Sequence, residues 1–421
     1  MSEAVSRFEG PPSAAKPAPE ASAAATAVAR PERNVSMGYL KAFITLLVVA
    51  HHAAIAYVPG LPKAGANFDK PPMLWSVFPI EDGRTFAPFG ILVSVNDVFF
   101  MSLMFFVSGL FVWDSLKRKG AAAFVRDRLL RLGLPFAVAA SLLAPLAYYP
   151  AYLVTGADPA LGAYWRAWTS LGDAWPAGPA WFIWVLLAYG VIAAGLYSIA
   201  PRWGEALGRL ARSADRRPLR LFLLLAAASS VAFTAMALAF TPIQWFALGP
   251  FAVQSARVLH YAVYFAAGIG VGAAGLSAGL LSPGGKLARR WWVWAGLAPL
   301  SVVLAAAVAI GGYVLKGAAA PGWQIASDLT WVLSCAVLCF AFLAGFTRFV
   351  RKPSRVWDSL SANAYGIYLV HYVFVIWLQY ALLPASVPGV VKGLAAFVGA
   401  AALSWATTAA LRRAPGLRRV L

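Results

Sequence analysis

The stretch KAFITLLVVAHHAAIAY, residues 41–57, has the composition of a membrane-spanning helix, yet it contains a lysine and two adjacent histidines. The whole chain of 421 residues has only four histidines. A neutral apolar residue would be easier to place in lipid, because polar and ionisable groups inside a membrane are costly. The positions of Lys41, His51 and His52 therefore indicate either a functional site or a specific contact between helices.

Composition and apolar runs predict an all-α polytopic membrane protein. Hydrophobic residues make up 61% of the chain and charged residues 12%, which is too little polar surface for a soluble protein of this length. Apolar runs of about 20 residues recur, each long enough to cross a bilayer as a helix. About ten transmembrane helices are predicted, at residues 37–57, 91–113, 132–154, 179–200, 221–241, 255–277, 291–313, 325–347, 361–383 and 390–411.

The basic residues predict how these helices are oriented. With the N-terminus in the cytoplasm, the inner segments contain 27 of the 35 Lys and Arg residues, and the outer loops contain five. This asymmetry follows the positive-inside rule and predicts two cytoplasmic termini. The alternative is nine or eleven helices, which would follow if the helix content of residues 242–277 is predicted wrongly. Topology thus explains the net charge of +19 without nucleic acid as a partner.

The chain divides into three predicted parts. Residues 1–34, rich in Ala, Pro and Ser, are predicted to be a disordered cytoplasmic tail. Residues 35–411 form the transmembrane domain, and residues 412–421 a basic cytoplasmic C-terminus. Cys335 and Cys339 lie four residues apart in one predicted helix and indicate small core residues. No metal site is predicted, because the four histidines are scattered.

Helical geometry places Lys41 and His52 on one face of the first helix. They are eleven residues apart, which at roughly 100° per residue brings them within about 20° of each other. His51 points about 80° away from that face. This polar stripe has two interpretations. It is a functional site, or it is a histidine bonded to a neighbouring helix and a lysine that reaches the headgroups.

The second helix and the loop after it contain the next polar candidates. Asp97, in VNDVFF, could orient a histidine from another helix, or it could satisfy free N–H groups at a helix start. Arg128 and Arg131, in FVRDRLLRLGLP, are one turn apart and open the third helix. They suit forked hydrogen bonds with phosphates, or they serve only to keep this loop in the cytoplasm.

Three later stretches add candidates of the same kind. Arg257 and His260, in RVLHYAVY, share a helix face that lines an outward cavity or a buried polar network. His371 follows Tyr368 by three residues, and an interhelical hydrogen bond explains it as well as catalysis does. Trp181 and the tryptophans near it could stack on sugar rings, although an interfacial aromatic belt is the commoner use of tryptophan.

Five sequence elements occur in a characteristic order. They are Lys41 with His52, FFVSG from Phe105 to Gly109, Arg128 and Arg131 with Pro135, Trp181-Phe182, and SANAYGIYLVH from Ser361 to His371. Over about residues 36–411 they resemble the acyltransferase-3 family of bacterial integral-membrane acyltransferases, which modify envelope carbohydrates and related acceptors. The branch that succinylates periplasmic glucans looks closest. Lys41 stands where arginine is usual, which keeps the charge but loses the forked geometry.

The resemblance implies an O-acyltransferase in the bacterial inner membrane. The enzyme would move an acetyl or succinyl group from cytoplasmic acyl-coenzyme A, a co-substrate, to a hydroxyl of an envelope glycan or lipid. No permanently bound cofactor is expected. The implied roles are catalysis for His52 as general base with Asp97 and His371, donor binding for Lys41, Arg128 and Arg131, and acceptor binding for Arg257, His260 and Trp181.

Two other hypotheses stay open from the residues. The first is a multi-pass transporter or flippase in which the intramembrane histidines relay protons. The second is a catalytically idle relative in an export complex. The basic residues near Arg128 and Arg131 favour the enzyme, because a proton relay has no obvious need for a phosphate-sized basic site on the inner side.

Overall fold

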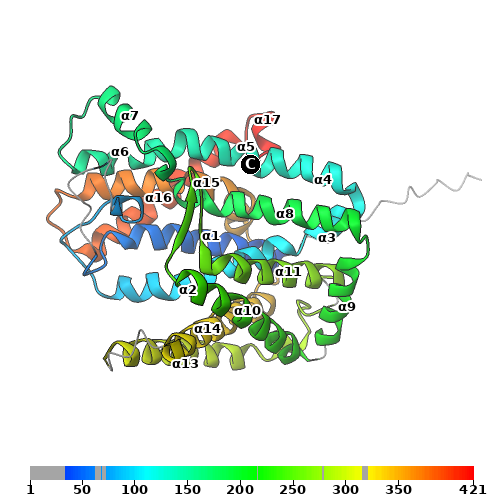
Figure 1. Cartoon of the computed structure of the whole chain (residues 1–421). Coiled ribbons are helices and arrows are strands. Elements are labelled where there is room, and N and C mark those ends of the chain that lie inside the picture. The colour runs from blue at the N-terminus through cyan, green and yellow to red at the C-terminus, as the bar shows by residue number, and fades with distance from the viewer. Residues whose placement is uncertain (1–33, 62–67, 69–72, 216, 277–278, 315–320) are drawn as a thin grey trace, which may run out of the picture. The chain divides into compact units, whose positions relative to one another are not determined.

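The computed structural model describes residues 34–421 except 62–67, 69–72, 216, 277–278 and 315–320, and these residues form a helical bundle (Figure 1). Apart from Asn34, the predicted tail lies outside the described residues. The Asn34 side chain accepts a hydrogen bond from the backbone N–H of Met37, as is typical of a residue that caps a helix N-terminus.

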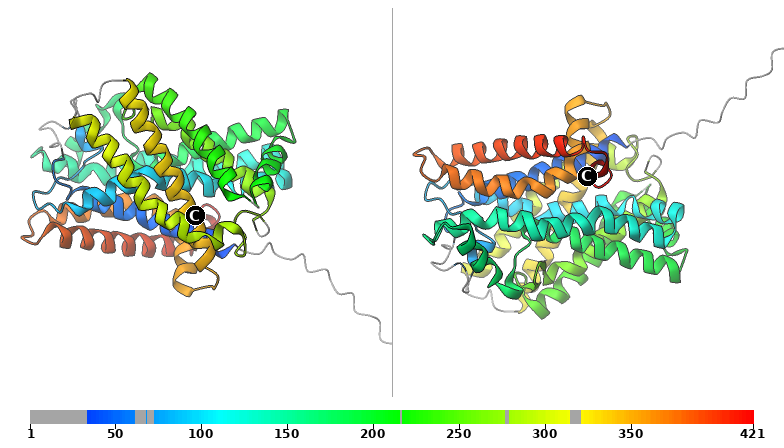
Figure 2. Two further views of the ribbon diagram at one scale, coloured as in Figure 1. Left: turned by 90° about the horizontal axis from the view of Figure 1, so that it is seen from below. Right: turned by 90° about the horizontal axis from the view of Figure 1, so that it is seen from above.

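Nine helical segments in the described part of the chain are long and apolar enough to cross a membrane, which confirms an all-α polytopic membrane protein. Each overlaps one of the predicted helices. The helices that form them are α1 (Val35–Ile55), α2 (Pro88–Gly109) with α3 (Val112–Lys119), α4 (Ala121–Arg128) to α6 (Ala144–Val154), α8 (Trp181–Ile199), α10 (Pro218–Phe240), α13 (Trp291–Val314), α14 (Pro321–Phe349), α15 (Arg355–Leu382) and α16 (Gly389–Leu411). The views in Figure 2 show α1, α15 and α16 side by side.

The remaining predicted helix, at 255–277, is present as α11 (Val258–Ala274) but is shorter than predicted. Its 17 residues extend about 26 Å at a rise of about 1.5 Å per residue. This is slightly less than the hydrocarbon thickness of about 30 Å, so α11 falls outside the nine. It still packs along α2 and against α9 (Trp203–Asp215), a helix within the predicted inner segment 200–220.

Glycines allow α2 and α11 to approach each other closely. A methyl group added at Gly268 would overlap the carbonyl oxygen of Phe106, and one at Gly109 would overlap that of Phe265. Gly272, one turn after Gly268, meets the backbone at the end of α2 in the same way. Small residues at such crossings are typical of membrane helices. The glycine of the FFVSG element is therefore explained by helix packing.

The structure corrects one prediction about the third helix. The segment 114–131, which separates the predicted helices 91–113 and 132–154 and was expected to be a cytoplasmic loop, is largely helical. It has a break at Gly120, whose φ of 76° suits glycine. The helix then continues through a π-helical segment, η2 (Leu129–Gly133), α5 (Leu134–Val138) and a second π-helical segment, η3 (Ala139–Leu143). Arg128 and Arg131 thus lie inside a continuous helical run, because no residue between Ala121 and Val154 interrupts it.

A β-hairpin between α10 and α11 was not predicted. β1 (Trp245–Leu248) pairs antiparallel with β2 (Phe251–Gln254), and Leu248 stands opposite Phe251 across a tight turn. The turn contains Gly249 with a φ of 55°. The Trp184 indole of α8 donates to the Ala252 carbonyl at 2.9 Å, which ties the hairpin to the start of that helix.

Short helices complete the described chain. They are α7 (Leu161–Thr169), α12 (Lys286–Arg289), α17 (Pro415–Arg418) and the 3₁₀ turns Leu74–Ser76, Gly172–Ala174, Gly178–Ala180 and Ser255–Arg257.

Candidate active site

His52 lies on the side of α1 that faces α15. Its ring centroid is 5.4 Å from that of His371 and 5.0 Å from that of Tyr372. His51 lies on a different side, where its ring stacks on Phe100 of α2 with the centroids 5.2 Å apart. The two neighbouring histidines therefore face different helices, as the helical geometry predicts.

His371 is held in one tautomer by its own helix. Its Nδ1–H donates to the backbone carbonyl of Tyr368 at 2.7 Å, because carbonyl oxygens only accept. Nε2 therefore carries the lone pair. This atom is buried and has no hydrogen-bond partner among the described residues. His51 and His260 each have such a nitrogen too, so the distinguishing feature of His371 is its position beside His52, where this nitrogen could take part in proton transfer.

Gln379 of α15 fixes the end of α1 and was missed in the sequence analysis. Its side-chain N–H groups donate to the carbonyls of His52 at 2.8 Å and Ala53 at 3.2 Å. Gln379 is fully buried. Its position could have been recognised from the sequence, because Gln379 is a lone amide in the apolar run VIWLQY. Buried polar side chains in membrane helices usually bond to another helix.

A cavity of about 570 Å³ lies at the end of the bundle that the charge pattern places in the cytoplasm. Eight basic residues line it: Lys41, Arg118, Lys119, Arg128, Arg131, Arg412, Arg418 and Arg419. Among the described residues of the lining, Asp127 has the single acidic side chain, and it pairs with Lys119. The lining therefore has a large excess of positive charge, which suits a ligand with several phosphate groups.

The π-helical segment η2 shapes one wall of this cavity. The Tyr365 hydroxyl of α15 donates to the Arg131 carbonyl at 2.7 Å, which gives that backbone oxygen a partner from another helix. The Arg128 guanidinium lies over the Phe124 ring, 4.9 Å from its centroid. π-helical segments are frequent at functional sites. The structure thus brings Lys41, Arg128 and Arg131 together on one cavity lining.

Tyr368 connects this cavity with the histidines. Its side chain lines the cavity, and its ring centroid lies 5.8 Å from that of His371. The Tyr368 hydroxyl donates to the Pro179 carbonyl just before α8. Tyr368 therefore stands between the basic cavity and the pair formed by His52 and His371.

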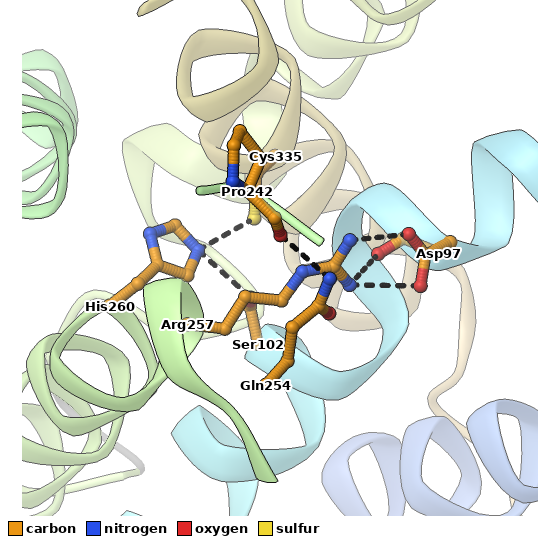
Figure 3. A network of polar contacts seen from close by, with 7 residues as sticks. All are labelled: Asp97, Ser102, Pro242, Gln254, Arg257, His260 and Cys335. Carbon is orange, nitrogen blue, oxygen red and sulfur yellow. Dashed lines mark hydrogen bonds and ion pairs between the residues drawn. The ribbon is translucent and has the colours of Figure 1, made fainter. Parts of the chain in front are cut away.

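Asp97 does not contact His52; it forms an ion pair with Arg257 (Figure 3). Its two carboxylate oxygens accept hydrogen bonds from the Arg257 guanidinium at 2.8 and 2.5 Å. The guanidinium also lies 4.8 Å from the Trp331 ring centroid. The Asp97 side chain is 45% exposed and that of Arg257 only 10% exposed. The Asp97 carboxylate thus binds an arginine, a partner that neither interpretation of this residue included.

His260 is fully buried between α2, α11 and α14. Its Nε2 lies 3.1 Å from the Ser102 hydroxyl and 3.6 Å from the Cys335 sulfur (Figure 3). It does not occur among the described residues that line the basic cavity. Cys335 and Cys339 are free and buried, which confirms that they are small core residues. This surrounding favours the buried-network interpretation of His260.

The outer tryptophans divide into several environments. Trp168 is 3% exposed and belongs to a buried aromatic cluster with Phe68 and Trp75. Trp181 is partly buried, with ring centroids 5.8 Å from Tyr261 and 6.0 Å from Trp245 of the hairpin. Trp181 therefore packs at the base of the hairpin, and its predicted contact with an acceptor stays a prediction.

Comparison with known proteins gives one match. A family model described as an acyltransferase domain matches residues 34–409, nearly the whole described chain. No curated protein and no solved structure matches. Within the described residues, no group of three or more His, Cys, Asp or Glu side chains is arranged to hold a metal ion.

Proposed function

Because the chain belongs to the acyltransferase-3 family, it is a membrane acyltransferase, and we propose that it transfers an acyl group from acyl-coenzyme A to a hydroxyl group of an envelope carbohydrate or lipid. One observation carries this proposal. A basic cavity at the predicted cytoplasmic end borders, through Tyr368, on the pair of His52 and His371. The cavity suits the phosphates of the donor, and the histidines suit proton transfer.

The donor would bind with its phosphates among Lys41, Arg128 and Arg131. The two arginines present forked donors one helical turn apart, a geometry matched to phosphate oxygens. Lys41 is eleven residues before His52, a rise of about 16 Å along α1. The extended pantetheine arm of coenzyme A would cover this span, so that the thioester passes Tyr368 and reaches the histidines.

The reaction is an acyl transfer between a thioester and an alcohol. His52, in its neutral form, accepts the proton of the acceptor hydroxyl while the oxygen attacks the thioester carbonyl carbon. The C–S bond then breaks, and the departing thiolate takes the proton from His52. The products are an ester and free coenzyme A. General base catalysis of this kind contributes typically about 10²–10⁴ in rate.

His371 is the candidate that orients His52. Its Nδ1–H is committed to the Tyr368 carbonyl, so Nε2 is free to accept a hydrogen bond from the His52 ring. Such a bond would fix the His52 tautomer and leave its other nitrogen as the base. In this assignment His371 orients His52 and does not itself take the proton of the acceptor. Asp97 holds the Arg257 guanidinium and does not contact His52.

The acceptor would approach from the outer side of the membrane. The ion pair of Asp97 and Arg257 has an exposed carboxylate that can accept hydrogen bonds from sugar hydroxyls. The predicted orientation places this pair on the outer half of α2, with the basic cavity inside. A bacterial inner membrane meets these requirements, because acyl-coenzyme A is cytoplasmic and envelope glycans are outside.

The test is consumption of acetyl- and succinyl-coenzyme A by the purified protein in nanodiscs, with an envelope glycan extract as acceptor. Wild type is compared with His52→Ala, and coenzyme A binding with Arg128→Gln/Arg131→Gln. We expect acceptor-dependent release of free thiol that disappears in His52→Ala. Absence of turnover with both donors, together with coenzyme A binding that does not depend on the two arginines, would contradict the donor assignment and favour the proton-relay transporter.

A further inference from the structure

The residues after α16 form part of the wall of the basic cavity. Arg412, Arg418, Arg419, Val420 and Leu421 all line it. The Arg412 guanidinium donates to the Ala362 carbonyl of α15 and to the backbone oxygen of Leu421 at 3.3 Å. These bonds hold the segment against the bundle, where it lines the cavity.

The arginines of this segment differ in whether they line the cavity. Arg418 and Arg419, at the end of α17, line the cavity, whereas Arg413 does not occur on the described lining. All three side chains are exposed. Retention of a segment in the cytoplasm requires basic charge but no particular direction of the side chains. The selective placement of two arginines therefore points to a ligand.

The cavity thus has arginine pairs on two separate elements. Arg128 and Arg131 lie on α4 and η2, and Arg418 and Arg419 lie at the end of α17. Coenzyme A likewise carries two separate phosphate groups, the diphosphate next to the pantetheine arm and the monophosphate on the ribose. The lining of the cavity also includes apolar residues and Tyr368, beside which the arm would enter.

We propose that Arg418 and Arg419 bind the ribose 3′-phosphate of the donor, while Arg128 and Arg131 bind its diphosphate. The segment after α16 is then a specificity element, which distinguishes coenzyme A from thioesters on carriers without this phosphate. The inference rests on the proposed donor and adds the contact by which the donor is recognised. Arg412 has a different role, because its bonds to Ala362 and Leu421 hold the segment in place.

The experiment measures binding of coenzyme A and of 3′-dephospho-coenzyme A to the full-length protein in nanodiscs by calorimetry. Wild type should bind coenzyme A about 10- to 100-fold more tightly, as expected for charge-assisted hydrogen bonds to one phosphate. Arg418→Gln/Arg419→Gln should bind both ligands alike, at the wild-type affinity for the dephosphorylated one. Arg413→Gln removes a neighbouring charge and should keep the wild-type ratio.

Each other outcome has a definite meaning. A double variant that keeps the wild-type ratio overturns the assignment of the 3′-phosphate, and so does an equal loss of affinity for both ligands, which indicates general attraction only. A wild-type ratio near one, with turnover intact, overturns this inference and leaves the proposed function standing. Wild type that binds neither ligand overturns both.

Discussion

Two histidine clusters lie within the bundle, and they differ in what surrounds them. His371 and His260 are both fully buried, and within the described part of the chain each has one ring nitrogen without a hydrogen-bond partner. Between α1 and α15, however, Tyr368 lies beside His371 and lines a large basic cavity. Between α2, α11 and α14, His260 is fully buried against Ser102 and Cys335. The same side chain thus lies beside a basic cavity in one place and in a packed core in the other. Both histidines are polar groups at membrane depth. They differ in that a cavity able to admit a ligand lies near His371, whereas His260 does not occur on its described lining.

The two helices that carry His260 and Ser102 also approach each other closely further along the bundle. Gly268 of α11 follows His260 by two turns, and it meets the backbone of α2 near Phe106. Ser108 of α2, one residue before Gly109, lines the basic cavity. Hence α2 is held rigidly on one side and contributes to the site on the other.

The largest effect on turnover is expected from His52→Ala. Loss of a general base should reduce acyl transfer about 10²–10⁴-fold while the unfolding temperature in detergent stays close to wild type. His51→Ala is the matched variant, because His51 faces α2 instead of α15. If His52→Ala stays active and His51→Ala is inactive, the general base is His51 and not His52.

A large effect on stability is expected from Gly268→Ala. The added methyl group has no space beside the Phe106 carbonyl, so α11 must move away from α2, at a cost of about 1–3 kcal/mol or more. Thermal unfolding in detergent measures it. Gly296→Ala in α13 is the control, since nothing lies within 4 Å of the added atom. Equal unfolding temperatures for the two variants would refute the close-packed contact.

A smaller loss is expected from Asp97→Asn, which leaves the charge of Arg257 without its carboxylate. We expect destabilisation of about 1–3 kcal/mol, below the value for fully buried pairs because Asp97 is half exposed. Asp97→Asn/Arg257→Gln should recover part of it in chemical denaturation. Glu205→Gln removes an exposed contact with Lys117 and should change stability by less than about 1 kcal/mol. Arg257→Gln alone completes the cycle. If the double variant loses at least as much free energy of unfolding as the two single variants lose together, Asp97 and Arg257 do not stabilise each other.

The smallest effect on turnover is expected from His260→Asn. Its surroundings predict a loss of stability, because a buried ring is removed next to Ser102 and Cys335. Initial rates per mole of folded protein should stay at the wild-type level. A specific loss of rate with an unchanged KM for the donor would instead place His260 in the reaction, and the distinction between the two clusters would fail.

Much of the fold follows from local sequence. Apolar runs gave the correct positions of the helices, since backbone groups in lipid must be bonded within a helix. The prediction was less accurate where a polar or interrupted sequence still forms regular structure. The segment 114–131 is helical although it is basic, and residues 245–254 form a hairpin although they are flanked by membrane helices. Both depend on contacts with α8, which no local pattern contains.

Local sequence is enough to predict the class of the protein and the face of α1 on which His52 lies. Both depend on helical periodicity and on the cost of placing polar groups in lipid, which act within one segment. The partners of the polar side chains, in contrast, depend on how the helices pack together. The tertiary structure joined Asp97 to Arg257 and His52 to His371, and it turned Arg418 and Arg419 towards the cavity. Partners that are far apart in the chain are selected by packing and glycine contacts, which become defined only when the helices assemble.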